Sequence, residues 1–410
     1  MYLLKAPVEK FGNLPAKSPL ISEEVLFTNN IAYCPKYFWK KWHCVQGCED
    51  VTPNWMKDMR RKRELYNILF IATGGLGDIM WCMPFMKAAR RRWPRARILV
   101  ATEERAMPLF AGVPFADLCV RDEFWNMQAL IRNAHEVYDF GGIATMFKKE
   151  MNMDPIDATF FDGELERPKD RKDCRPMLVL TVDEGKQTEA LLRRNGIDPW
   201  KDRIITIALE SSTPNRNWPH SHTKELTERL IAAGYKVIWL SESKDFGNSF
   251  FYQCECGTPF DFTTQTPPER LDWICPKCKK INGVSEVKTV DGVVNLGGKT
   301  NIRQAMGIIA LSDVFVGPNS GLMVIATALE TPTIGLFGAF EPRRITQYYD
   351  KFAYIWGHAE CAPCSEHWTE CRYGYPAPCM RIITADMVQG KINEMLKRYP
   401  KKATERRPIL

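Results

Sequence analysis

Two glycine-rich turns, each at the end of a short apolar run, restrict most strongly what this chain can fold into. The first is Gly-Gly-Leu-Gly-Asp at residues 74–78, and the second is Gly-Pro-Asn-Ser-Gly at residues 317–321. Each pattern predicts a buried strand, a tight turn and a helix, the helices covering 79–92 and 322–329. Ligands of open α/β sheets bind at the carboxyl ends of strands, where a helix N-terminus favours a phosphate. The two turns therefore predict two nucleotide-binding-type α/β domains that face a common cleft.

Length and composition agree with a two-domain soluble protein. The chain has 410 residues, more than one core of ordinary size accommodates. Its net charge of +7 suits an anionic ligand or surface without requiring nucleic acid. No apolar run is long enough for a transmembrane segment, and the N-terminus lacks the apolar core of a signal peptide. We therefore expect a cytoplasmic protein whose 14 cysteines are thiols or metal ligands rather than disulfides.

Alternating apolar runs and helical patterns divide the chain. We expect one Rossmann-like domain over residues 65–175 and a second over 176–385, both with mostly parallel sheets. An N-terminal extension covers 1–64, an insertion covers 244–290, and a C-terminal helix and tail cover 386–410.

The expected elements follow from the same patterns, with a polar passage between the domains at residues 154–175. The other expected strands are 67–73, 97–101, 116–121, 136–140, 203–208, 236–240, 293–296, 314–316 and 333–337, and the other expected helices are 221–233 and 301–310.

Asp78, the last residue of the first turn, is a candidate for chemistry in the first domain. Aspartate is also a favoured N-cap for purely local reasons, so its position alone leaves both interpretations open. The spacing Gly-Gly-x-Gly-Asp differs from the dinucleotide-binding fingerprint.

A polar loop at residues 210–219, Glu-Ser-Ser-Thr-Pro-Asn-Arg-Asn-Trp-Pro, follows another expected strand. Hydroxyl groups and a guanidinium at such a position suit a diphosphate. The alternative is an ordinary polar loop in which Trp218 anchors the core. We expect His220 and His222, at the start of the next helix, to be exposed to solvent.

In order and spacing, these motifs resemble the ADP-heptose-dependent heptosyltransferases of lipopolysaccharide synthesis, which have the GT-B fold. The resemblance covers about residues 67–395 without the insertion. The matching features are Gly77-Asp78 with Pro84 and Pro94, the block 216–219, the block 317–338, Cys361-Ala-Pro-Cys364, Cys371 and Cys379-Met380.

The resemblance implies an inverting transfer of a sugar from a nucleotide-sugar donor to an acceptor hydroxyl, without a catalytic metal. Asp78 matches the family's general base, which takes the proton from the attacking hydroxyl. Arg216 stands where the family usually has lysine, and either cation offsets charge on the leaving nucleoside diphosphate. The positions that match the donor site are Gly77, Ser211, Ser212, Arg216, Glu242, Asn319, Ser320, Gly321 and Leu322, with Glu242 expected at the ribose.

Two departures from the family pattern lie in the second turn. Asn319 replaces the usual aspartate, and Val324 replaces the usual histidine four residues after the turn serine. The missing acid normally lies near the donor sugar. The resemblance therefore leaves the sugar and its nucleotide open, an ADP-sugar being one candidate.

Three functions compete. The first is transfer to a saccharide or a lipid-linked saccharide such as lipopolysaccharide. The second is transfer to a hydroxylated base of DNA, which the basic residues 60–63, Lys40 and Lys41 favour. The third is an inactive sugar-nucleotide binding protein, against which the presence of Asp78 argues.

Two cysteine quartets are candidate metal sites. Cys254, Cys256, Cys275 and Cys278 form two close pairs separated by a loop, which predicts a structural Cys₄ zinc ribbon within the insertion. Four thiolates fill the coordination of zinc, so this site is not catalytic. For Cys361, Cys364, Cys371 and Cys379, a second metal site and ordinary loop thiols remain alternatives.

Overall fold

The computed structural model divides into two units, Met1–Met177 and Leu178–Leu410. It describes residues 66–123, 127, 130–131, 133–141, 153–163, 165–242, 290–364, 371, 373 and 376–400, together with several short strands elsewhere.

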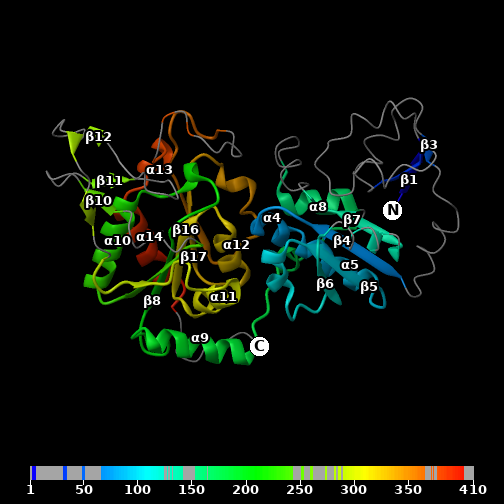
Figure 1. The fold of residues 1–410 in the computed structure, drawn as a ribbon, viewed down its shortest axis with the longest axis horizontal. Coiled ribbons are helices and arrows are strands. Elements are labelled where there is room, and N and C mark those ends of the chain that lie inside the picture. The colour runs from blue at the N-terminus through cyan, green and yellow to red at the C-terminus, as the bar shows by residue number, and fades with distance from the viewer. Residues whose placement is uncertain are drawn as a thin grey trace. The chain divides into compact units, whose positions relative to one another are not determined.

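The first unit contains a four-stranded parallel sheet (Figure 1). The strand order is β6-β5-β4-β7, so the chain order reverses between β4 and β7. The strands are β4 (Asn67–Ala72), β5 (Arg97–Thr102), β6 (Leu118–Arg121) and β7 (Glu136–Asp139). The helical elements are α4 (Leu76–Trp81), α5 (Met83–Arg92), η1 (Glu104–Phe110), α8 (Pro155–Gly163) and η2 (Arg171–Cys174).

Strand β4 is the centre of the core of this unit because both of its faces are covered. On one face Phe70 packs against Phe85 of α5 and Phe140 after β7. On the other face Leu69 and Ile71 belong to a separate apolar cluster. A strand covered on both faces reads as a continuous apolar run, which is why the sequence predicted it.

Two expectations in the first unit are wrong. The helix expected over 79–92 is two helices, α4 and α5, which meet at Cys82. Pro84 lies in the first turn of α5, where a missing N–H costs little, so the break precedes it. The polar passage expected over 154–175 contains α8 and η2, and Phe160 of α8 packs against Phe85.

The second unit contains a six-stranded parallel sheet in the order β15-β9-β8-β16-β17-β18. With its strands numbered in chain order, this sheet has the 3-2-1-4-5-6 order of the doubly wound fold, with its switch point between β8 and β16. The strands are β8 (Ile204–Ala208), β9 (Lys236–Leu240), β15 (Val294–Asn295), β16 (Val314–Pro318), β17 (Thr333–Phe337) and β18 (Phe352–Trp356).

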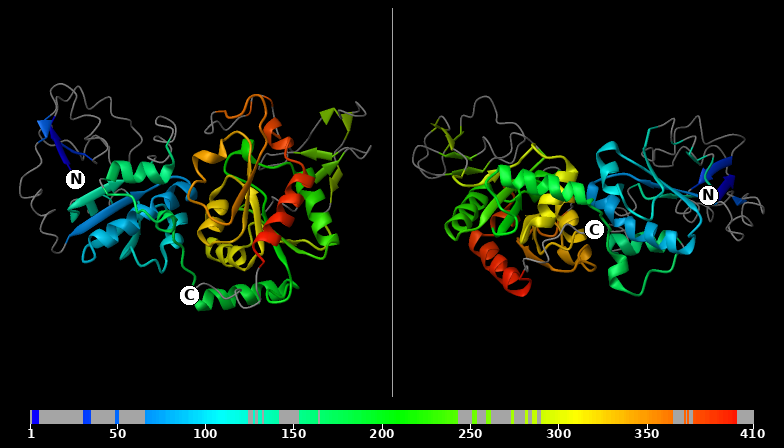
Figure 2. Two further views of the ribbon diagram at one scale, coloured as in Figure 1. Left: turned by 180° about the vertical axis from the view of Figure 1, so that it is seen from behind. Right: turned by 90° about the horizontal axis from the view of Figure 1, so that it is seen from below.

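Helices cover both faces of this sheet. They are α10 (His220–Ala232), α11 (Ile302–Leu311), α12 (Gly321–Ala328), α13 (Pro378–Arg381) and α14 (Ala385–Arg398). Helix α9 (Val182–Arg194) packs on α11, and η3 (Pro214–Arg216) and η4 (Pro342–Arg344) lie in loops. Helices α10 and α14 lie on one face, and α11 and α12 lie on the other (Figures 1 and 2). Strand β18 and helix α9 were not among the elements expected from the sequence.

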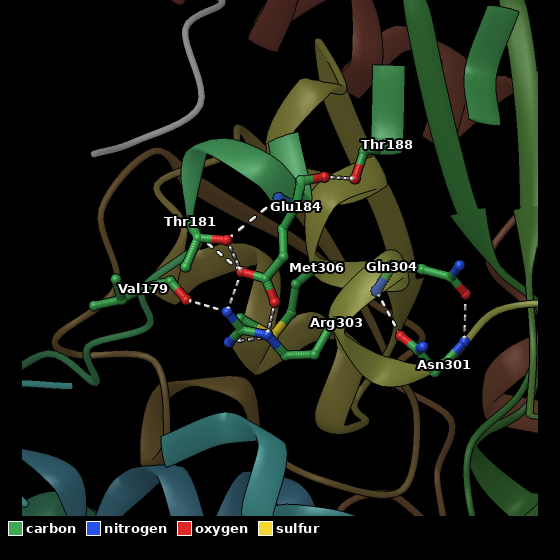
Figure 3. Close-up of polar contacts among 8 residues, drawn as sticks. All are labelled: Val179, Thr181, Glu184, Thr188, Asn301, Arg303, Gln304 and Met306. Carbon is green, nitrogen blue, oxygen red and sulfur yellow. Dashed lines mark hydrogen bonds and ion pairs between the residues drawn. The ribbon is translucent and has the colours of Figure 1, made fainter. Parts of the chain in front are cut away.

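Helix α9 packs on α11 through side chains that the sequence analysis did not single out (Figure 3). Thr181 caps α9, and its hydroxyl accepts a hydrogen bond from the backbone N–H of Glu184. Arg303 of α11 donates to the Glu184 carboxylate and to the carbonyl oxygen of Val179. These contacts fix the start of the second unit to its core.

Short antiparallel strands lie in the segments outside the two parallel sheets. In the insertion, β10 (Phe251–Gln253) pairs with β11 (Pro259–Asp261) and β14 (Ser285–Val287), and β12 (Trp273–Ile274) pairs with β13 (Ile281–Asn282). Near the N-terminus, β1 (Tyr2–Lys5) pairs with β2 (Ile31–Cys34) and β3 (Glu49–Asp50).

The prediction of an α/β fold with parallel sheets is confirmed. The domain boundaries expected from the sequence, with an extension at 1–64 and an insertion at 244–290, stay predictions. Within the described part of the chain, no helix has the length and apolar character needed to cross a membrane.

Candidate functional site

The first glycine turn holds Asp78 at the carboxyl end of β4. Gly74 has a φ of +118°, which side-chain-bearing residues rarely adopt. The N–H of Gly75 donates to Asp78 Oδ2 over 3.2 Å, so the carboxylate satisfies the N-cap N–H at the start of α4. Asp78 is partly exposed and lies in the first turn of α4 rather than at the N-cap, which is Gly75.

A second carboxylate, Asp139, lies close enough to Cys82 to act on it together with Asp78. It ends β7, the strand beside β4, and its Oδ1 accepts a hydrogen bond of 2.8 Å from the N–H of Gly141. Burial raises the pKa of the Cys82 thiol well above its usual range, and the Asp78 and Asp139 carboxylates raise it further. The sequence analysis missed Asp139, although its place directly before two glycines at a strand end was the available signal.

Arg216 joins the two loops at the switch point of the second sheet. Its Nη1 donates a hydrogen bond of 2.9 Å to the carbonyl oxygen of Asn319, a residue 103 positions away. Its Nη2 donates to Ser212 Oγ over 3.3 Å, and its Nε donates to Thr213 Oγ1. The guanidinium is thus fixed between the loop after β8 and the turn after β16.

The turn after β16 presents an unusual serine. Ser320 is the N-cap of α12, yet its side chain makes no capping hydrogen bond. Its Oγ is buried and has no hydrogen-bond partner in the described residues. The next two residues, Gly321 and Leu322, begin α12, whose first N–H groups have no intrahelical acceptor. The hydroxyl and these N–H groups together form a ready anion site.

The other expected donor residues lie in three different elements. Ser211 is buried, and its hydroxyl donates within its own loop, to Thr213 O and Asn217 Oδ1. Glu242 is exposed at the end of β9, where its N–H donates to Glu210 Oε1 over 2.8 Å. Gly77 lies in the first unit, within α4.

Three residues within or close in sequence to the polar loop or the second glycine turn are buried in the core. Trp218 is buried and its Nε1 donates to the carbonyl oxygen of Ile383, as the core-anchor alternative predicts. Val324 is buried in the core as well. The expectation that His220 is exposed is wrong, because it is 3% exposed, and His222 is only partly exposed.

The cysteines of the second quartet lie near one another. Burial, followed by the proximity of Cys364, Cys361 and Cys371, raises the pKa of the Cys379 thiol to about 11. Within the described residues, no three His, Cys, Asp or Glu side chains converge as a metal-binding group. The first quartet, Cys254, Cys256, Cys275 and Cys278, lies outside the described residues, as do Lys40, Lys41 and residues 60–63.

Comparisons with known proteins agree with this architecture. Residues 276–373 match the sequence model of glycosyltransferase family 9 (heptosyltransferase). The chain is 30% identical to lipopolysaccharide heptosyltransferase 2 of Salmonella typhimurium over 330 residues, which cover 71% of this chain and 82% of the relative. The Escherichia coli K12 enzyme of the same name is 31% identical over 330 residues, with the same coverage of both chains. A Haemophilus influenzae lipooligosaccharide heptosyltransferase 2 is 32% identical, but the match spans 33% of its length.

Solved structures show the same fold. The E. coli ADP-heptose lipopolysaccharide heptosyltransferase II superposes with a TM-score of 0.55 at 19% identity, covering 81% of this chain and 99% of that structure. The dodecameric iron-containing heptosyltransferase TibC, in complex with ADP-D-β-D-heptose, gives 0.54 at 15% identity, with 86% and 79% coverage. The reported matches lend no support to a DNA acceptor. The fold and the extent of sequence identity together show that this chain belongs to the heptosyltransferase family, glycosyltransferase family 9, and is a glycosyltransferase.

Proposed function

We propose that this enzyme transfers a sugar, with inversion, from a nucleoside diphosphate donor to a hydroxyl of a saccharide acceptor. One observation carries the proposal: Arg216 spans the switch point of the second sheet to reach Asn319 O, beside the buried hydroxyl of Ser320. An α/β sheet of this order binds its ligand at that point. The polar groups that converge there are those a diphosphate requires.

The donor diphosphate is proposed to lie against the start of α12. Ser320 Oγ and the N–H groups of Gly321 and Leu322 donate to its oxygens, and Arg216 and Ser212 approach from the loop after β8. Because Arg216 is already fixed by two neighbouring loops, it offsets charge on the leaving group without reorganising. Glu242, exposed at the end of β9, is proposed as the ribose ligand.

Asp78 is proposed as the general base. It is partly exposed at the carboxyl end of β4, and the N–H of Gly75 orients one of its oxygens. A carboxylate suits this role because attack on the anomeric carbon needs only partial deprotonation of the acceptor hydroxyl in the transition state.

The substrate class follows from the relatives. Two of them are named lipopolysaccharide heptosyltransferase 2, and TibC was solved with ADP-D-β-D-heptose. We propose an ADP-sugar as donor and a lipopolysaccharide-type saccharide as acceptor. Asn319 and Val324 replace two residues of the family pattern, so heptose is the first sugar to test rather than the only one.

The first cysteine quartet is proposed to hold a structural zinc ion. Cys254 and Cys256 fall in sequence between the paired strands β10 and β11, and Cys275 and Cys278 fall between β12 and β13. Thiol pairs between paired strands are typical of zinc ribbons. No metal is proposed for the second quartet, because its described cysteines do not converge as a metal-binding group.

Ligand binding and turnover of one variant test the function. The wild-type chain is expected to bind ADP and ADP-heptose, measured by calorimetry, and to transfer the sugar to a truncated lipopolysaccharide. Asp78→Ala is expected to bind both nucleotides normally and to lose turnover. Asp122→Ala, which removes a carboxylate just after β6 at the same sheet edge, is the control and keeps turnover. Undiminished transfer by Asp78→Ala would remove that residue from the mechanism, and absence of nucleotide binding would refute the donor site.

A further inference from the structure

Glu103 and Arg105, which follow β5, bind both backbone polar groups of Gly74 and so fix the peptide units on either side of it. Glu103 Oε1 accepts a hydrogen bond of 3.1 Å from the N–H of Gly74. Arg105 Nη2 donates one of 3.1 Å to the carbonyl oxygen of the same glycine. The two side chains are joined to each other, with Arg105 Nε 2.6 Å from Glu103 Oε2. We call this arrangement the Glu103–Arg105 clamp.

The clamp acts on the residue whose conformation sets the turn. Gly74 has a φ of +118°, and the N–H of the next residue, Gly75, binds Asp78 Oδ2. A Cβ added at Gly75 would lie 2.9 Å from Asp78 Oδ2, so the backbone and the carboxylate are in close contact. A change in the Gly74 peptide plane would therefore displace the Asp78 carboxylate.

Stability alone does not account for the clamp. The side chains of Arg105 and Glu103 are 53% and 33% exposed. Ion pairs this exposed contribute about 0 to 1 kcal/mol to folding. By contrast, moving a catalytic group by about 1 Å costs as much as 100-fold in rate. Loss of these contacts should therefore lower the rate, through displacement of Asp78, much more than it lowers the free energy of unfolding.

We propose that Glu103 and Arg105 are positioning residues, which fix the Gly74–Gly75 turn and thereby hold the Asp78 carboxylate for proton transfer. This inference rests on the proposed role of Asp78 as base. Neither residue belongs to the glycine motif, and both lie at the start of η1, directly after the neighbouring strand, so only the pairing of β4 with β5 brings them to the turn.

The test compares Arg105→Ala and Glu103→Ala with Arg121→Ala. Arg121 is a matched control because it forms a neighbouring pair with Glu104, with side chains 52% and 72% exposed. We expect both clamp variants to lose about 10- to 100-fold in kcat. The KM for the donor should change less than about two-fold and Tm should fall by less than about 4 °C. Arg121→Ala should keep wild-type kcat.

Three further measurements separate positioning from a general structural role. Glu103→Gln keeps an oxygen that can accept from Gly74 N–H, so it should recover part of the kcat lost in Glu103→Ala. Amide hydrogen exchange of a peptide covering residues 73–78 should accelerate in both alanine variants and not in Arg121→Ala. Because the two side chains act as a unit, the double alanine variant should be no slower than Arg105→Ala.

The outcomes are distinguishable. A kcat within two-fold of wild type in both alanine variants, or a loss of kcat that comes with an equal loss of donor binding and a large fall in Tm, would overturn the clamp. Full turnover by Asp78→Ala, measured in parallel, would instead overturn the proposed base. Accelerated exchange with a reduced kcat, alongside an inactive Asp78→Ala, supports both.

Discussion

Arg303 of α11 and Glu184 of α9 form a two-point ion pair, with Nε–Oε1 at 2.7 Å and Nη2–Oε2 at 2.6 Å. Their side chains are 13% and 26% exposed, so the pair is largely removed from solvent (Figure 3). The hydrogen bonds from Arg303, followed by those from Thr181, lower the pKa of Glu184 to about 2. The pair therefore ties the stability of the second unit to the ionised state of one carboxylate.

Arg303→Met should lower the free energy of unfolding by about 2 kcal/mol at pH 7. Glu184 in the unfolded chain has a pKa of about 4.3, above its folded value, so the stabilisation is complete above that pH and disappears as pH falls toward 2. Chemical denaturation at several pH values should show the difference between variant and wild type shrinking over this window. Lys391→Met, which breaks the more exposed pair with Glu394, is the control and should cost less than about 0.5 kcal/mol. A difference independent of pH would contradict the assignment to Glu184.

Gly307 and Thr188 should behave as a coupled pair. A Cβ added at Gly307 would lie 2.1 Å from Thr188 Oγ1, so Gly307→Ala should destabilise the chain by about 1 to 3 kcal/mol. Adding Thr188→Ala removes that oxygen and should recover part of the loss in thermal unfolding. Gly390→Ala, at a helical site with no atom near the new Cβ, should be neutral or slightly stabilising. Equal effects at both glycines would refute the packing argument.

Arg216 should be needed for the affinity of the nucleoside diphosphate. Arg216→Ala should weaken ADP binding by about 10- to 100-fold in calorimetry, the range for losing a charged hydrogen bond. Arg216→Lys keeps the charge but cannot reach Asn319 O and the Ser212 hydroxyl in the same geometry, so it should recover only part of the affinity. Arg193→Ala on α9 removes an exposed cation without such contacts and should leave binding unchanged. If Arg216→Ala bound ADP with unaltered affinity, the diphosphate would have to bind at another site.

The first cysteine quartet should hold about one zinc ion per chain, as a tetrahedral thiolate site does. Elemental analysis of purified protein should find the zinc, and Cys278→Ser should reduce it by about one equivalent. Cys364→Ser and Cys119→Ser are the controls and should leave the metal content unchanged, since neither residue belongs to that quartet. A folded wild-type sample without zinc would refute the site, and an equal loss in Cys364→Ser would show that the second quartet binds metal as well.

Short patterns of apolar residues and glycines along the chain were enough to predict many of its strands and both turns. Strands such as β4 and β17 are covered on both faces, so they read as continuous apolar runs. The turns after β4 and β16 need glycine and small residues, which mark them in the sequence. The order of these motifs along the chain was sufficient to identify the heptosyltransferase family, which the comparisons confirm.

Two expectations failed for different reasons. Pro84 is a local signal for the break at Cys82, which the single helix expected over 79–92 did not take into account. His220 is buried although histidine at a helix start usually faces solvent, so there the surroundings, not the residue's own propensity, decide the outcome.

The sequence by itself determined the α/β class, the two glycine turns and the family, because these depend on residues adjacent along the chain. Only the tertiary structure decided that Arg216 reaches Asn319 O and that Glu103 and Arg105 hold Gly74. Those contacts join segments 29 to 103 residues apart, and they exist because neighbouring parallel strands end at the same edge of a sheet. Strand order is a property of the assembled sheet, and hydrophobic periodicity reports only which face of each strand is buried.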